Sequence, residues 1–189
     1  MSKQLWVIAG GNGSGKSTFY DKALRPMGVP FVNADNIARE FFSDDPEGKS
    51  YEAAKLAAAI REEALQEGKT FCIETVFSHP SKIDFIGQAK AMGYQVIMVI
   101  IHVESTQLNL ARVAQRVAQG GHSVPAQKII DRVPRMLTCV KAAIPLCDEV
   151  YLLDNSSTEK PLLTVAKIIG GIVTREAHIP DWADELLTR

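Results

Sequence analysis

A short glycine-rich segment near the start of the chain has the residue types needed to hold a nucleoside triphosphate. Residues 10–18 read Gly-Gly-Asn-Gly-Ser-Gly-Lys-Ser-Thr and contain Gly-x-x-x-x-Gly-Lys-Ser, the pattern of a phosphate-binding P-loop. The backbone N–H groups of such a loop point at the phosphates, and the helix that follows adds the partial positive charge of its N-terminus. Lys16 can reach the β- and γ-phosphates, and the hydroxyl of Ser17 can ligate Mg²⁺. The segment therefore predicts binding of ATP with Mg²⁺.

The flanking residues fit a P-loop better than a dinucleotide-binding turn. An apolar run at residues 5–9 comes directly before the segment, as expected for a strand, and residues 17–27 read as the helix that should follow. The dinucleotide pattern Gly-x-Gly-x-x-Gly fails, because its last position is Lys16 in one register and Thr18 in the other. We assign nucleotide binding to Gly10, Asn12, Gly13, Ser14, Gly15, Lys16, Ser17 and Thr18.

Polar residues at the ends of two later strands are candidates for the chemistry itself, because open α/β sheets bind ligands at the carboxyl ends of their strands. Asp35 follows the expected strand 29–33 and could accept a proton from an attacking hydroxyl, or it could only cap the next helix. Glu74 and Thr75 end the expected strand 70–75, where they could hold a substrate hydroxyl or support Mg²⁺, or lie in a solvated loop. His79 could wall an acceptor pocket, or its segment could only begin the next helix.

Basic residues between positions 105 and 135 indicate a lid over the phosphates. Arg112 and Arg116 are four residues apart and share a helix face. A second stripe on one face lies beyond a Gly-Gly break and consists of Lys128, Arg132 and Arg135. Because arginine forks match phosphate oxygens, Arg116 and Arg112 are candidates for stabilising charge on the transferring phosphoryl group. The alternative is that both stripes are solvated helix faces.

Two further polar positions lie at the same expected edge of the sheet. Asn155 sits in a polar turn after the expected strand 149–153 and could contact the nucleotide base, although a plain turn is nearly as good an interpretation. His102 ends the expected strand 94–103 among apolar neighbours, which favours a structural histidine over a catalytic one.

Strand-like and helix-like segments alternate along the chain, which predicts an α/β fold with a parallel sheet. We expect the P-loop kinase fold: a central, mostly parallel sheet flanked by helices on both faces, with a helical lid. Residues 1–189 should form a single domain, with the lid at about 105–135 and a small C-terminal extension at 158–189. The helix 125–146 should be interrupted near Pro134, and residues 162–169 and 171–176 should form a hairpin.

The overall composition excludes several classes of partner. With 21 Lys and Arg against 22 Asp and Glu, the net charge of −1 provides no basic field to attract nucleic acid or an anionic membrane. The longest apolar stretch, 96–101, is far short of the ~20 residues of a membrane span. The three cysteines lack metal-ligand spacing, and the N-terminus leaves no room for a signal peptide. We therefore expect a cytoplasmic protein whose partners include neither nucleic acid nor a membrane.

The order of these motifs resembles the zeta-toxin family of P-loop kinases. Besides the P-loop, the similarity rests on Val-Asn-Ala-Asp at 32–35, Ile-Glu-Thr at 73–75 and Gly-Tyr-Gln-Val at 93–96. It also includes Arg-Val-x-x-Arg-Val from 112, Gly-Gly-His-x-Val-Pro from 120 and Asp-Asn-Ser from 154, and together the matches cover roughly residues 5–157. The second group is the more specific, since many families share a P-loop.

The resemblance implies an ATP- and Mg²⁺-dependent kinase of a small molecule, the best-known acceptor of the family being UDP-N-acetylglucosamine. By that match Asp35 would be the general base on the acceptor hydroxyl, Lys16 and the lid arginines would stabilise the transferring phosphate, and Glu74 with Thr75 would contact the acceptor. Larger toxins often have a helical antitoxin protein as a partner. The segment 74–78 departs from their Glu-Gly-Thr form, which leaves the acceptor open.

Two classes of function therefore stand side by side. The first is a small-molecule kinase in which Asp35 activates the acceptor. The second is a nucleotide-dependent ATPase switch that acts through a protein partner. The absence of an Asn-Lys-x-Asp motif argues against a GTPase, and the two acids Asp35 and Glu74 together with an internal arginine lid favour transfer to a second substrate.

Overall fold

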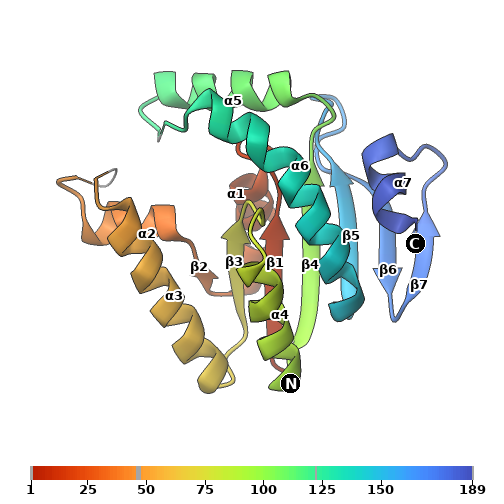
Figure 1. The fold of residues 1–189 in the computed structure, drawn as a ribbon, viewed down its shortest axis with the longest axis horizontal. Coiled ribbons are helices and arrows are strands. Elements are labelled where there is room, and N and C mark those ends of the chain that lie inside the picture. The colour runs from red at the N-terminus through yellow and green to blue at the C-terminus, as the bar shows by residue number, and fades with distance from the viewer. Residues whose placement is uncertain (1, 46–47, 122, 189) are drawn as a thin grey trace.

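A computed structural model of the protein describes residues 2–45, 48–121 and 123–188. Within this part of the chain, seven strands form one sheet in the order β2-β3-β1-β4-β5-β6-β7 (Figure 1). The pairs among β1 to β5 are parallel, whereas β6 runs antiparallel to both of its neighbours. The strands are β1 (Gln4–Ala9), β2 (Phe31–Val32), β3 (Phe71–Thr75), β4 (Gln95–His102), β5 (Glu149–Asp154), β6 (Leu163–Ile169) and β7 (Ile172–Arg175).

The helices connect the strands, except α7, which follows β7, and they cover both faces of the sheet, which confirms the expected α/β fold class. They are α1 (Lys16–Phe19), the π-helical turn η1 (Tyr20–Leu24), the 3₁₀ turn η2 (Arg25–Met27), α2 (Ala34–Phe41), α3 (Ser50–Gln66), α4 (Ser81–Ala91), α5 (Thr106–Ala118), α6 (Ala126–Ala143), the 3₁₀ turn η3 (Ile144–Leu146) and α7 (Asp181–Leu187). The expected hairpin at 162–176 is also present, as β6 and β7. Within the part of the chain that the structure describes, no helix is both long and apolar enough to cross a membrane.

The two faces of the sheet are covered unequally. Alternation along β1 sends Leu5 and Val7 to the larger apolar cluster, which includes buried residues of α3, α4, α6 and α7. Ile8 points to the opposite face, where Tyr20 and Leu24 of η1 build a smaller cluster. The helical segment that follows the P-loop is thus anchored on a face of its own, and this holds the P-loop at the carboxyl end of β1.

Strand β2 is shorter than the expected 29–33 because its flanking residues have other hydrogen-bond partners. The N–H of Val29 donates to Leu24 O, and Pro30 has no N–H to contribute. At the other end, Asn33 leaves the strand to cap α2. Val32 still pairs with Ile73 of β3, so the ends of β2 and β3 lie next to each other.

The interruption expected near Pro134 does not occur: α6 runs unbroken from Ala126 to Ala143. A proline inside a helix removes one backbone hydrogen bond and tends to kink the helix. Here the following turns are fixed by packing, since Met136 and Val140 are buried in the larger cluster. The helix continues because tertiary burial outweighs the local cost of the proline.

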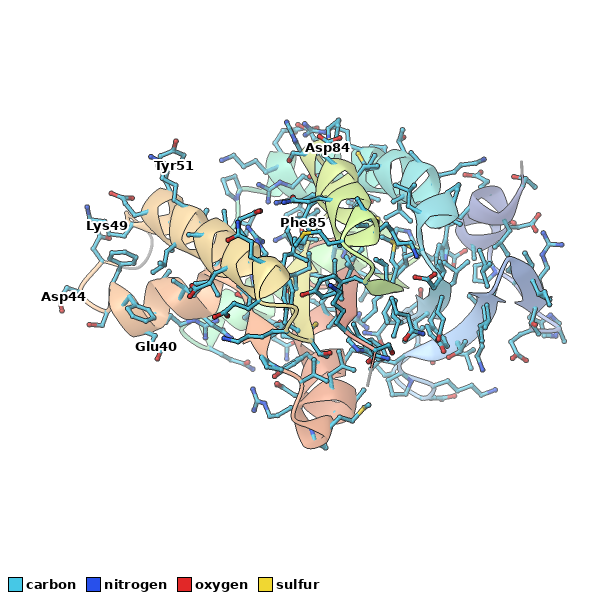
Figure 2. All side chains as sticks on the ribbon, turned by 90° about the horizontal axis from the view of Figure 1, so that it is seen from below. Glu40, Asp44, Lys49, Tyr51, Asp84 and Phe85 are labelled. Carbon is cyan, nitrogen blue, oxygen red and sulfur yellow. The ribbon has the colours of Figure 1, made fainter. Side chains whose placement is uncertain are left out.

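Helices α2 and α3 form an arm beside β2, at the left of Figure 1. Figure 2 shows Glu40, Lys49 and Tyr51 on this arm, with their side chains pointing away from the body of the molecule. Helix α3 begins at Ser50, and residues 46 and 47, between the two helices, lie outside the described part of the chain. Ser50, at the start of α3, reaches the cavity described below.

Candidate functional site

The P-loop connects the end of β1 to α1 and is enclosed by neighbouring backbone. A Cβ atom added at Gly10 would lie 2.2 Å from the carbonyl oxygen of Ile101, at the end of β4. At Gly13, where φ is +76°, an added Cβ would lie 2.9 Å from the carbonyl oxygen of Asn109 on α5. Because a real Cβ does not approach backbone oxygen that closely, β4 and α5 can pack on this loop only with glycine at both positions.

Lys16 and Ser17 both meet Glu74, at the end of the adjacent strand β3. The Lys16 ammonium is buried; it donates to the carbonyl of Gly11 at 3.0 Å and lies 3.7 Å from Glu74 Oε1. Burial lowers the pKa of Lys16, and the charges of Glu74 and Asp35 act in the opposite direction. The hydroxyl of Ser17 donates to Glu74 Oε2 at 2.8 Å. The carboxylate thus holds the two P-loop side chains that a nucleotide with Mg²⁺ would use.

Asp35 is not the cap of α2. The cap is Asn33, whose side chain accepts a hydrogen bond of 3.1 Å from the N–H of Asn36. Asp35 lies in the first helical turn, is exposed, and makes no side-chain hydrogen bond or ion pair with any residue that the structure describes. The alternative that Asp35 only caps the helix is therefore removed, and its carboxylate is available to the cavity that it lines.

A cavity of about 330 Å³ opens beside the P-loop, a size that suits a small ligand. It brings together five of the residues assigned from sequence: Asn12, Lys16, Asp35, Glu74 and Thr75. The cavity is also lined by residues 123–125 and by Lys128 and Arg132 of α6. A phosphate-binding loop, the carboxylate of Asp35 and two basic side chains therefore line one cavity.

The turn after β3 is strained where it borders this cavity. Phe77 has φ of +60°, which is unfavourable for a bulky residue with a Cβ. Its N–H donates to Thr75 Oγ1 at 3.0 Å, and its ring is buried in the larger cluster. Burial of the ring and this hydrogen bond hold the turn that directly follows Glu74 and Thr75, both of which line the cavity. Strain of this kind concentrates at functional sites.

His79 is not among the residues that line the cavity. Its ring is exposed, its Nδ1 lies 2.9 Å from Ser81 Oγ, and the same nitrogen accepts from the N–H of Ser81 at 3.2 Å. The His79 ring therefore accepts a backbone hydrogen bond at the first residue of α4. An acceptor-binding role for His79 stays a prediction that this geometry does not favour.

Three side chains tie the P-loop to neighbouring elements. Asn109 of α5 donates to the carbonyl of Asn12 at 2.7 Å, and Asn155 donates to the carbonyl of Ser14 at 2.8 Å. Arg112 in turn donates to the carbonyl of Asn155 at 2.8 Å. Sequence reasoning missed Asn109, although its spacing of three residues from Arg112 places both on one helix face.

The sequence predicts that Asn155 contacts the nucleotide base and that Arg116 stabilises charge on the transferring phosphoryl group. Both ends of the Asn155 side-chain amide are engaged, because its Oδ1 accepts from the N–H of Leu162 at 3.1 Å. Arg116 lies one turn beyond Arg112, near enough to Lys16 for its charge to lower the pKa of that lysine. A Cβ on Gly121 would lie 2.6 Å from Arg116 Cγ, so Gly121 packs closely against this side chain. His122 of the same motif lies outside the described residues.

Buried polar atoms without a hydrogen-bond partner gather at this loop. Of five such side-chain atoms in the described part of the chain, all but Trp182 Nε1 belong to the P-loop or to α5; these are Asn12 Oδ1, Ser14 Oγ, Asn109 Oδ1 and Arg112 Nη1. Orphaned buried groups are costly, so their concentration here fits a site completed by a polar ligand. Among the described residues, no cluster of three or more His, Cys, Asp or Glu side chains could hold a metal, so Mg²⁺ would depend on Ser17, Glu74 and the nucleotide itself.

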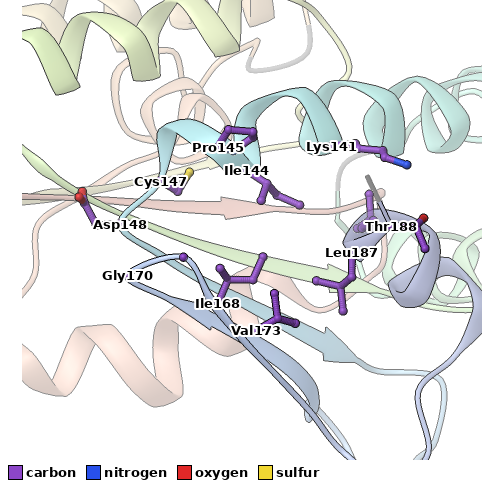
Figure 3. A pocket seen from close by; sticks show the side chains of 12 residues that line it. Lys141, Ile144, Pro145, Cys147, Asp148, Ile168, Gly170, Val173, Leu187 and Thr188 are labelled. Atoms are coloured by element: carbon purple, nitrogen blue, oxygen red, sulfur yellow. The ribbon is translucent and has the colours of Figure 1, made fainter.

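A second and larger cavity, of about 620 Å³, lies at the opposite edge of the sheet (Figure 3). It is bordered by the end of α6, the β6–β7 turn and α7, and its walls include Ile144, Cys147 and Val173. Burial raises the pKa of the Cys147 thiol to about 12, which keeps the thiol protonated and unreactive. None of the residues assigned from sequence lines this cavity, so the smaller one is the candidate site.

Comparisons with known proteins agree with this geometry. A family model described as an AAA domain matches residues 5–135. An uncharacterized protein from Haemophilus influenzae is 31% identical over 130 residues, which is 65% of this chain and 91% of that protein.

Solved structures share the fold at low sequence identity. A chain of the AvrRxo1-ORF1:AvrRxo1-ORF2 complex with ATP has a TM-score of 0.72 and 20% identity; the match covers 93% of this chain but only 61% of that one. The PezAT toxin–antitoxin system of Streptococcus pneumoniae has a TM-score of 0.67 and 12% identity, covering 98% and 82%. A proposed kinase from Chloroflexus aurantiacus has a TM-score of 0.64 and 15% identity, covering 85% and 92%. The fold is that of a P-loop kinase-like, nucleotide-binding domain.

Proposed function

We propose that this chain, which belongs to the AAA domain family, is an ATP-dependent kinase that phosphorylates a hydroxyl group of a small molecule. The observation that carries the proposal is the position of Asp35: it lines the same cavity as Lys16 and Glu74, and its carboxylate has no hydrogen-bond or ion-pair partner among the described residues. An acceptor in this cavity would lie between a proton-accepting group and the phosphate-binding loop. A switch that only hydrolyses its nucleotide needs no acceptor-sized space beside the P-loop.

Each residue of the site would have a distinct role in this phosphoryl transfer. ATP with Mg²⁺ would supply the phosphoryl group, whose bond to the β-phosphate oxygen breaks as a bond to the acceptor oxygen forms, leaving ADP. Asp35 would take the proton of the acceptor hydroxyl. Lys16 would neutralise the phosphates, and Ser17, held by Glu74, would ligate the metal. Arg112 and Arg116 would stabilise the charge that develops on the transferring group.

The acceptor that we propose to test first is UDP-N-acetylglucosamine. The support is the zeta-toxin resemblance of the motifs and the likeness in fold to the PezAT toxin–antitoxin system. The same two observations support a search for a helical antitoxin partner, and the likeness to the AvrRxo1-ORF1:AvrRxo1-ORF2 complex adds to the case for a protein partner. Segment 105–135 would act as the lid that excludes water.

Mass spectrometry of a reaction with Mg-ATP and a panel of hydroxyl acceptors tests the kinase. We expect one acceptor to gain the mass of one phosphate, and expect no such product from Lys16→Ala. The matched control is Lys22→Ala, which removes an exposed lysine of the same helical segment and should leave the product unchanged. Slow ATP turnover that no acceptor accelerates would instead favour the nucleotide-dependent switch, and a protein partner would then be sought in cell extract.

A further inference from the structure

A small cavity of about 200 Å³ lies between helices α3 and α4 and shares no lining residue with the cavity beside the P-loop. One face of each helix borders it, because its residues on each helix are three or four positions apart or adjacent. Arg61 and Glu62 come from α3, Lys82 and Phe85 from α4, and Ile73 from β3. The cavity therefore combines an apolar part with charged side chains from two helices.

Two of the residues that line this cavity, Arg61 and Lys82, are cations on different helices. Both side chains are only partly exposed, and burial lowers the pKa of each. The charge of Arg61 lowers the pKa of Lys82 further, so the two groups are close enough to repel each other. Neither side chain makes a hydrogen bond or ion pair with any residue that the structure describes.

The acid that lines the same cavity, Glu62, is engaged elsewhere. Its Oε1 accepts a hydrogen bond of 2.7 Å from Gln88 Nε2, which joins α3 to α4. Burial is the sole influence on the pKa of Arg61, and none of the described carboxylates raises the pKa of Arg61 or Lys82. The two cations therefore lie in a partly dry place without the partner that buried charges ordinarily have.

We propose that this cavity is a binding site for a phosphate group, held between Arg61 and Lys82. A phosphate group at neutral pH carries between one and two negative charges, which offset the two cations, and the guanidinium fork of arginine fits its oxygens in pairs. Ile73 and Phe85 leave apolar space beside the anion, so the phosphate is either free or the end of a small ester. This ligand is separate from the substrates of the proposed kinase, and the inference does not rest on that function.

A bound phosphate would link two helices that lead to the candidate site. Helix α3 begins at Ser50, which lines the cavity beside the P-loop, and α4 follows the turn after Glu74 and Thr75. Without an anion, the repulsion between Arg61 and Lys82 opposes the packing of α3 on α4. Groups that are kept for a ligand at the expense of stability have this signature, because neutralising one of them favours the empty protein.

Calorimetric titration with inorganic phosphate tests the site, with Mg-AMP-PNP at saturation so that the P-loop is filled. We expect phosphate to bind with a Kd that Arg61→Met and Lys82→Met each raise at least about tenfold, as expected when a charge-assisted contact is lost. Methionine keeps much of the apolar stem of both side chains. Lys55→Met, which removes an exposed lysine of α3, is the matched control and should bind like the unaltered protein.

Thermal unfolding gives a readout that a purely structural pair of cations would not. Without phosphate, Arg61→Met and Lys82→Met should each keep or raise the Tm, because each removes a partly buried charge and its repulsion. Phosphate at 100 times its Kd should raise the Tm of the unaltered protein by about 5–10 °C, and that of each variant by about half as much or less. A lowered Tm in both variants, with no gain from phosphate in the unaltered protein, would overturn the site.

Two further probes separate the sources of the anion. Tighter binding of phenyl phosphate than of inorganic phosphate would assign the cavity to an ester, whose ring packs near Phe85, and the reverse order would assign it to free phosphate. Benzoate bound as tightly as phenyl phosphate would overturn the choice of phosphate. Phosphate binding that Arg132→Gln weakens and Arg61→Met does not would place the anion beside the P-loop and overturn this site. Since none of these measurements needs turnover, a failure of the proposed kinase would leave the inference standing.

Discussion

The side-chain amide of Asn109, on α5, donates a hydrogen bond of 2.7 Å to the carbonyl oxygen of Asn12, inside the P-loop. Asn109 is buried, and its own carbonyl oxygen lies over Gly13. The first half of α5 is therefore packed onto the phosphate-binding loop as one unit. A lid motion of segment 105–135, as we propose it, would be confined to the end of α5, the Gly-Gly break and the start of α6.

This relationship predicts that Asn109 is a positioning residue for nucleotide binding. Asn109→Ala should leave the carbonyl of Asn12 buried without a donor, a change worth about 1–3 kcal/mol. We expect the Kd for ATP to rise by about tenfold, measured by calorimetry, whereas the control Gln107→Ala on the exposed side of α5 should bind like the unaltered protein. Unchanged ATP affinity with a lowered Tm would mean that Asn109 only stabilises the fold.

The position of Asp35 predicts a separation of binding from catalysis. Asp35→Asn should keep the Kd for ATP within a factor of about two and lower kcat by roughly 10²–10⁴, as expected for loss of a general base. The helix should stay folded, because Asn33 and not Asp35 provides its cap. Glu40→Gln, an acid of α2 on the outer side of the arm, is the control (Figure 2). An unchanged kcat in Asp35→Asn would remove Asp35 from the chemistry.

His102 predicts a loss of stability in mild acid. The ring is buried, with its centroid 4.9 Å from that of Trp182, and burial lowers the pKa of His102 from 6.5 to about 4, although Asp154 acts in the opposite direction. Below pH 6.5 the unfolded chain therefore takes up a proton that the folded chain refuses. The stabilisation is complete above pH 6.5 and is lost as pH falls towards 4, by up to about 3 kcal/mol.

Urea unfolding at pH 7, 5.5 and 4.5 measures this loss. His102→Asn removes the titrating group, so the difference in unfolding free energy between it and the unaltered protein should shrink as the pH falls. A difference that stays constant across this range would show that His102 titrates alike in the folded and unfolded chain.

Short-range sequence patterns determine several features of this protein without any tertiary contact. The P-loop, the alternation of strands and helices, the β6–β7 hairpin and α7 depend on neighbouring residue types and on hydrophobic periodicity, which act over short stretches of chain. The rule that strand ends share one edge was enough to bring Lys16, Asp35, Glu74 and Thr75 into one cavity.

Tertiary structure decided what depends on partners that are distant in sequence. Pro134 remains inside α6 because Met136 and Val140 are buried against the sheet. The side chain of Asn109 contacts a loop 97 positions away in the sequence. Lys128 and Arg132 line a cavity whose other residues include the start of α2, the end of β3 and the P-loop. Packing between elements decides where a side chain points and which charged groups lie near it. The periodicity within one element cannot predict either.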